Sequence, residues 1–295
     1  MTRQVPVSDD ARIDAPAEHH VHEIAPAVAY QRLAIVNVVY LGVPGSAGWV
    51  LVDTGVPGSA GSIRRAAAAR FGEGSRPAAI VMTHGHFDHV GALEELAGEW
   101  QVPVYAHQAE RLYLDGSAAY PPADPRVGGG MMARLSRLYP RGPVDVSAWL
   151  RTLPADGGVP EMPGWRWIST PGHSPGHVSL WRTADGTLVA GDAFVTTDQE
   201  SVYGAAAQPP ELHGPPMYYT PDWERAEESV KRLAELPVER VVTGHGRALA
   251  GPELRAGLRR LADEFRELAV PREGRYVEEP AGAGSGREYR PPDAR

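Results

Sequence analysis

The feature that most constrains this chain is a short loop that concentrates metal-binding side chains. Residues 83–89 (THGHFDH) hold three imidazoles and one carboxylate, directly after an apolar run that is typical of a short buried strand. Imidazole and carboxylate are ligands for zinc and similar ions. A single ion held by all four would have no open position for a substrate. The loop therefore predicts two adjacent metal sites, with His84 and His86 at one and Asp88 and His89 at the other.

Three later segments argue against the alternative that this loop is only a solvated, histidine-rich turn. Each follows an apolar, strand-like run, lies beside glycine and presents one ligand-type side chain on a tight loop. The three side chains are His173, Asp192 and His245. An earlier aspartate, Asp53, follows the strand-like run 49–52 in the same way.

This ordered set of motifs resembles the metallo-β-lactamase superfamily of binuclear hydrolases, over about residues 20–250. The resemblance implies an α/β (α+β) fold, a metallo-β-lactamase-like αββα sandwich in which helices flank two facing mixed β-sheets and the metals lie at one edge. It also implies a ligand set: His84, His86 and His173 for the first ion, Asp88, His89 and His245 for the second, and Asp192 as a bridge between them.

The resemblance further implies two divalent ions, zinc above all, with iron or manganese as alternatives. Such a pair holds a bridging hydroxide that attacks a carbonyl, so no covalent enzyme intermediate forms. Asp88 is placed to transfer a proton as well as to bind metal. Asp53 lies behind the metals, where its carboxylate can accept the free N–H of a ligating imidazole. The residues alone leave open that Asp53 caps the turn at 54–55.

The same resemblance narrows the substrate to a carbonyl ester-type bond. The motifs look most like the glyoxalase II-like branch, which implies hydrolysis of a thioester or related ester, and lactonases share the ligands. Two alternatives stay open: an iron-dependent sulfur dioxygenase of the same fold, and a non-catalytic binding module. A proline-stiffened loop, 209–220, supplies the candidate substrate contacts: His213, Met217, Tyr218 and Tyr219.

Composition limits the partners. A formal net charge of −8 argues against nucleic acid, because binding to phosphates needs clustered lysine and arginine. The chain has no cysteine, which removes thiolate ligands and cysteine nucleophiles. No apolar stretch is long enough to span a membrane, and residues 1–20 lack the apolar core of a secretion signal. We therefore expect a cytoplasmic protein with a small-molecule substrate, and a homo-oligomer is compatible with these features.

Periodicity and turn residues predict two rounds of strands and helices. The expected strands are two within 21–40, then 49–52, 78–82, 165–169, 177–181, 188–190 and 238–243, and the expected helices are 59–71, 92–99, 222–236 and 252–268. The expected organisation is an N-terminal arm (1–20), one metallo-β-lactamase-fold domain (21–270) and a mobile C-terminal tail (271–295), with 275–277 docking as the alternative. Region 108–160, too irregular for another sheet unit, is expected to be an insertion that folds over the metal edge.

Overall fold

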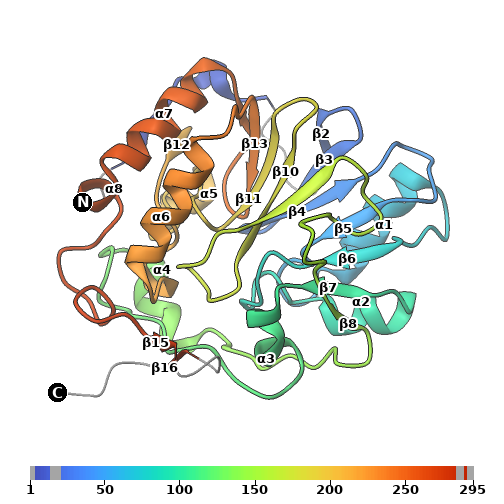
Figure 1. Ribbon diagram of the computed structural model, residues 1–295, viewed down its shortest axis with the longest axis horizontal. Coiled ribbons are helices and arrows are strands. Elements are labelled where there is room, and N and C mark those ends of the chain that lie inside the picture. Colours follow the sequence, from blue (N-terminus) through green and yellow to red (C-terminus); the bar gives the residue numbers. More distant parts are fainter. Residues whose placement is uncertain (1–3, 14–20, 284–288, 291–295) are drawn as a thin grey trace.

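Two facing β-sheets form the centre of the computed structural model, which describes residues 4–13, 21–283 and 289–290 (Figure 1). The first sheet has seven strands in chain order: β2 (Val21–Ala25), β3 (Val28–Leu33), β4 (Val36–Leu41), β5 (Val50–Val52), β6 (Ala79–Val81), β7 (Val104–Ala106) and β8 (Leu150–Thr152). The second has five, in the order β14 (Leu249–Ala250), β13 (Arg240–Thr243), β11 (Thr187–Gly191), β10 (Val178–Arg182) and β9 (Trp165–Ser169).

Helices cover the outer face of each sheet. Figure 1 shows α1 (Ala60–Phe71) and α2 (Leu93–Trp100) beside the seven-stranded sheet, and α6 (Trp223–Ala234) and α7 (Pro252–Asp263) beside the five-stranded sheet. The remaining helices of the described residues are short: α3 (Arg111–Leu114), α4 (Met131–Leu135), α5 (Val202–Ala207) and α8 (Phe265–Leu268), with 3-10 turns η1 (Asp9–Ala11), η2 (Gln108–Glu110), η3 (Ser136–Leu138) and η4 (Met217–Tyr219).

The alternation of side chains along the strands explains the four layers. In β4, Val39 and Leu41 belong to the apolar core between the two sheets, together with Leu180 of β10. Their neighbours Val38 and Tyr40 point to the opposite face and pack in the core that includes α1 and α2. Successive residues of a strand face opposite sides, so a strand buried on both faces needs apolar residues throughout. The predicted αββα sandwich is confirmed.

Three details differ from the sequence-based expectation. Residues 21–41 form three strands rather than two, because Ala27 and Ala34 adopt left-handed backbone angles (φ 62° and 59°) that make tight turns without glycine or asparagine. Strands β7 and β8 are not among the expected strands; β8, inside the expected insertion, extends the sheet in parallel with β7, and it lacks the apolar run of the equally short β5 and β6 because two of its three residues are exposed. The last helix is divided at Glu264 into α7 and α8.

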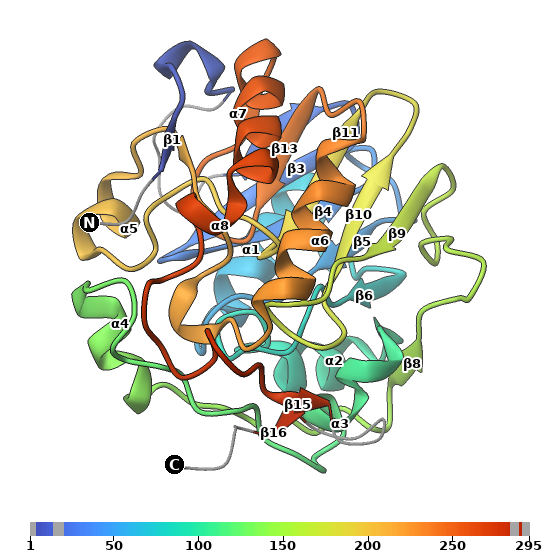
Figure 2. The same cartoon turned by 60° about the vertical axis from the view of Figure 1, so that its left-hand side comes forward.

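The two ends of the described chain pack on the domain. Strand β1 (Val5–Pro6) pairs with β12 (Glu211–Leu212). After α8 the chain runs to the insertion, where the buried Tyr276 donates its hydroxyl proton to the Pro122 carbonyl at 2.6 Å, and strands β15 (Gly282–Ala283) and β16 (Tyr289–Arg290) lie near α3 (Figure 2). The rest of the expected mobile tail lies outside the described residues. Within the described part of the chain, no helix combines the length and apolarity needed to cross a membrane.

Candidate functional site

The side chains predicted as ligands all sit on loops where strands end. The loop 83–89 follows β6, and His173 lies between β9 and β10. Asp192 directly follows β11, and His245 follows β13. Strands β5 and β6 are parallel, as are β11 and β13, so their carboxyl ends meet at one edge of the sandwich. Open α/β sheets commonly bind ligands at that edge.

Three overlapping groups of these side chains are arranged to hold a metal ion, with ligand atoms that lie within 4.8 Å of one another in each group. The first group is His84, His86 and His173, the second is His84, His89 and Asp192, and the third is Asp88, His89 and His245. Together they contain all seven predicted ligands. Every group combines side chains from loops of both sheets.

The imidazoles are oriented by hydrogen bonds on their far nitrogens. Nδ1 of His89 lies 2.8 Å from the Asp53 carboxylate, and Nδ1 of His245 lies 2.6 Å from the Ile35 carbonyl. Nδ1 of His173 lies 3.3 Å from the Thr220 hydroxyl. Such contacts fix the tautomer and direct Nε2 toward the other predicted ligands: Nε2 of His173 lies 2.9 Å from Nδ1 of His86, and Nε2 of His245 lies 3.0 Å from Oδ2 of Asp192.

Buried atoms without partners show that this cluster suits a metal. Nε2 of His84, Nε2 of His89 and Oδ1 of Asp192 are buried, and none of them has a hydrogen-bond partner in the described structure. A buried polar atom left unpaired is costly, so a ligand is expected there. A Cβ at Gly244 would lie 1.9 Å from Oδ1 of Asp192, which explains the glycine at that position.

Asp53 holds the loop that carries four of the predicted ligands. Its Oδ1 accepts the Thr83 N–H at 2.8 Å, and its Oδ2 accepts the Thr83 hydroxyl at 2.7 Å as well as facing His89. The carboxylate therefore bonds toward the metal loop, and no hydrogen bond of the described residues joins it to the turn at 54–55. The structure gives Asp53 the position that the resemblance implied.

Burial keeps the three imidazoles of the first group neutral. Burial lowers the pKa of His86 to about 3, and burial also holds the pKa of His84 and His173 well below the usual range. These imidazoles therefore stay neutral and able to bind metal. Burial alone would raise the pKa of Asp192, but the imidazoles of His245 and His89 outweigh it and hold that pKa well below its ordinary value. The central aspartate is therefore ionised.

His177 supports the central aspartate from behind. Its Nε2 accepts the Asp192 backbone N–H at 2.8 Å, while its Nδ1 lies 2.8 Å from the Thr170 hydroxyl. Both nitrogens are occupied, so this histidine positions the Asp192 loop. Burial lowers its pKa to about 4.

Replacing His177 by glutamine is expected to remove a pH dependence from the stability of the metal-free protein. Below about pH 6.5 the imidazole of the unfolded chain takes up a proton, whereas the buried His177 remains neutral down to about pH 4. Protons then favour unfolding, so this group destabilises the wild type increasingly as the pH falls from about 6.5 to 4. Unfolding free energies from denaturant titration at pH 7 and pH 4.5 measure this loss, and an equal loss in wild type and variant would contradict it.

Glu110 contacts the metal-binding loops and has no signal in the sequence. The fully buried carboxylate accepts the Gly85 N–H at 3.0 Å and the Gly176 N–H at 2.7 Å. Both donors belong to loops that carry predicted ligands, but Glu110 belongs to none of the three groups. Its side chain was missed because it acts through backbone groups that only the folded chain brings together.

The candidate substrate contacts fall into two sets. Tyr219 stacks on the His86 ring, with centroids 4.7 Å apart, and its buried hydroxyl has no hydrogen-bond partner in the described structure. Tyr218 lies beside it, and both tyrosines line a small cavity with His86. Met217 is buried in the same turn. His213 instead lies 3.0 Å from the Glu211 carboxylate and joins none of the three groups.

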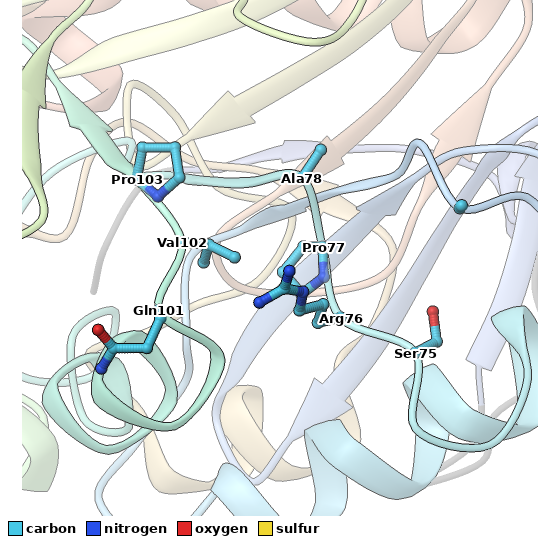
Figure 3. Close-up of a pocket in the computed structure, with 8 residues that line it drawn as sticks. Ser75, Arg76, Pro77, Ala78, Gln101, Val102 and Pro103 are labelled. Atoms are coloured by element: carbon cyan, nitrogen blue, oxygen red, sulfur yellow. The ribbon is translucent and has the colours of Figure 1, made fainter.

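A larger hollow of about 440 Å³ lies away from this cluster (Figure 3). It is lined by Ala47 and by residues 75–78 and 101–103. These segments precede β6 and β7, whereas the metal-binding loop follows β6. The hollow is therefore at the opposite end of these strands, and we assign it no part in the chemistry.

The fold and this cluster agree with comparisons to known proteins. A sequence model of the Metallo-beta-lactamase superfamily matches residues 32–245. The chain therefore belongs to the metallo-β-lactamase superfamily, and its histidine and aspartate groups are a candidate site for divalent metal ions.

Individual relatives agree with that class. A protein of Bacillus subtilis (strain 168) described as "Probable metallo-hydrolase YflN" is 46% identical over 247 residues, which cover 83% of this chain and 94% of that protein. A "Hydroxyacylglutathione hydrolase" of Alkalilimnicola ehrlichii is 34% identical over 43% of this chain and 37% of its own length. The crystal structure of a Beta-lactamase domain protein from Burkholderia ambifaria superposes with a TM-score of 0.59 at 22% identity, covering 90% of this chain and 80% of that one, and supports the fold alone.

Proposed function

We propose that the protein is a binuclear metal-dependent hydrolase that cleaves a thioester, ester or lactone of a small molecule. In this proposal one divalent ion, zinc above all, is held by His84, His86 and His173. The other is held by Asp88, His89 and His245. Asp192 lies between the two, and two bound ions supply an activated water and polarise the carbonyl of the substrate.

The observation that carries the proposal is the position of Asp192 between the two sets of imidazoles. Its Oδ2 lies 3.0 Å from Nε2 of His245 and 3.4 Å from Nε2 of His173. Its Oδ1 faces Nε2 of His89 at 3.6 Å. A single carboxylate therefore reaches histidines of both proposed sites, which suits a bridge between two ions. Nitrogen and oxygen donors without any thiolate suit zinc.

The chain's own groups also suit proton transfer and substrate binding. The Asp88 carboxylate is buried beside His245, at 3.4 Å from its Nε2, and burial raises its pKa, so it can take or return a proton. Within the described residues the buried hydroxyl of Tyr219 has no partner, so it can donate to a substrate oxygen. The hydroxyacylglutathione hydrolase among the relatives supports a thioester as one substrate to test.

The direct test is turnover by the metal-loaded protein. Zinc content is measured first, and the protein is then given an acyl thioester, a simple carboxylic ester and a lactone, with release of the carboxylic acid followed. Hydrolysis of at least one class, with close to two zinc ions per chain, is the expected result. Inactivity toward all three classes with both ions bound would overturn the proposal. Oxygen consumption with a persulfide and one bound iron would favour the sulfur dioxygenase instead.

Replacing Tyr219 by phenylalanine is expected to lower kcat/KM by about 10-fold, the effect of losing one hydrogen bond of about 1.4 kcal/mol. The ring that stacks on His86 is kept, so metal content should not change. Tyr203→Phe is the control, because Tyr203 is 76% exposed on α5. Unchanged kinetics of the Tyr219 variant on every substrate that the wild type accepts would remove Tyr219 from the substrate site.

A further inference from the structure

Glu110 joins the two loops that supply the first group of ligands. Its Oε2 accepts the Gly85 N–H at 3.0 Å and the hydroxyl of Tyr120. Its Oε1 accepts the Ser174 hydroxyl at 2.8 Å and the Gly176 N–H at 2.7 Å. One buried carboxylate therefore receives four hydrogen bonds, two on each oxygen.

The donors lie next to the ligands in the chain. Gly85 is between His84 and His86, and Ser174 follows His173 directly. These three histidines are the whole of the first group. Because Glu110 bonds to one loop through Oε2 and to the other through Oε1, it fixes the distance between the ligands that the two loops carry.

The surrounding packing leaves no freedom for this arrangement to shift. A Cβ at Gly176 would lie 2.8 Å from Cγ of Glu110, and a Cβ at Gly85 would lie 2.8 Å from the Tyr120 hydroxyl. The Gly176 backbone therefore lies against the Glu110 side chain, and the Gly85 backbone lies against the Tyr120 hydroxyl. The Tyr120 ring also packs against His86, with centroids 4.4 Å apart.

A different carboxylate, Asp53, holds His89. Asp53 bonds to His89, a member of the third group, and to Thr83, whose hydroxyl lies 3.0 Å from Nδ1 of His84. The four donors to Glu110 instead lie close to ligands of the first group: Gly85 is next to His84 and His86, Ser174 and Gly176 follow His173, and the Tyr120 ring packs against His86. A glutamine at position 110 could accept with one oxygen only, and its NH₂ would face two of the present donors. A carboxylate is therefore required to satisfy all four.

We infer that Glu110 is a positioning residue that sets the metal affinity of the group His84, His86 and His173 and leaves the group Asp88, His89 and His245 unaffected. The inference rests on the proposed function only in that both groups bind metal ions. Partners of this kind, one step removed from the ion, typically contribute about 10- to 100-fold to metal affinity.

The first experiment is a zinc titration of metal-free Glu110→Gln against a competing chelator. One of the two ions should bind about 10- to 100-fold more weakly than in the wild type, while the affinity for the other is unchanged. Glu211→Gln is the matched control, because Glu211 is also a buried carboxylate that accepts a backbone N–H, from Asp198, and the partners of its side chain among the described residues, Asp198 and His213, are not predicted ligands. That control should keep both affinities.

Two backgrounds identify which ion is affected. In the His245→Ala background, in which the second proposed site binds its ion weakly, Glu110→Gln should lower the affinity for the ion at the first site. In His173→Ala, which weakens the first, the same change should have no further effect. Equal weakening in both backgrounds would indicate general destabilisation and overturn the inference. A wild type that binds no zinc would overturn the proposed function and the inference with it, whereas two tightly bound ions in Glu110→Gln would overturn the inference alone.

A milder variant covers the case in which Glu110→Gln does not fold. Ser174→Ala removes one of the four donors and leaves the others. It should weaken the same ion by a smaller factor, again only in the His245→Ala background. Unchanged zinc affinity of Ser174→Ala in that background would count against the inference.

Discussion

Asp192→Asn is expected to bind both metal ions more than about 100-fold more weakly and to lose hydrolysis. A side chain that only orients a metal ligand contributes about 10- to 100-fold to metal affinity, so the loss of a direct ligand should cost more. Among the described residues, Asp192 is the carboxylate that reaches Nε2 of His89, His173 and His245. Asparagine keeps the size of the side chain but removes the negative charge. The affinity should therefore fall for both ions rather than for one.

Metal analysis after dialysis against a weak chelator, together with initial rates, checks this expectation. Asp185→Asn is the matched control, since Asp185 pairs with Arg182 at the surface, in the turn before β11. The control should retain both ions and full activity. If Asp192→Asn kept both ions at wild-type affinity, the bridging position would be wrong.

Removal of the metal ions is expected to abolish hydrolysis, and added zinc is expected to restore it. The chain has no cysteine to act as a nucleophile. With water as the attacking group, the rate depends on ions held at the buried, unpartnered atoms of His84, His89 and Asp192. Full activity of the stripped protein would contradict this, as would a side chain found acylated during turnover.

One serine needs to be considered as an alternative nucleophile. Residues 172–176 match the pattern Gly-x-Ser-x-Gly, which marks the nucleophile in another hydrolase fold where a strand leads into a helix. Here the loop joins strand β9 to strand β10, and the fully buried Ser174 donates its proton to Glu110 rather than to a histidine. Ser174→Ala should therefore retain hydrolysis once zinc is supplied in excess.

The sequence was sufficient to predict the fold, and the side chains that it marked as ligands lie together in three groups. Each predicted ligand follows a strand and lies near glycine, so the pattern marks it locally, as with Asp192 after β11 and His245 after β13. Strand β8 escaped prediction because two of its three residues are exposed, whereas the equally short β5 and β6 are apolar throughout. The turns at Ala27 and Ala34 also escaped prediction, because alanine rarely adopts their left-handed backbone angles.

Apart from Asp53, the groups that orient the ligands could not be predicted. The Ile35 carbonyl and the Thr220 hydroxyl reach His245 and His173 from distant parts of the chain. Glu110 acts in the same way, through backbone N–H groups of other loops. Such contacts depend on how the two sheets pack, and no local pattern in the sequence encodes them. The metal identity and the substrate class are predictions that the fold and the site leave to experiment.

Every candidate metal group takes members from loops of both sheets. An ion held there would cross-link the two halves of the sandwich, in addition to the apolar side chains between the sheets and to hydrogen bonds such as those of Glu110. Because an ion that binds only the folded chain shifts the folding equilibrium by mass action, bound metal would stabilise the fold as well as take part in the chemistry.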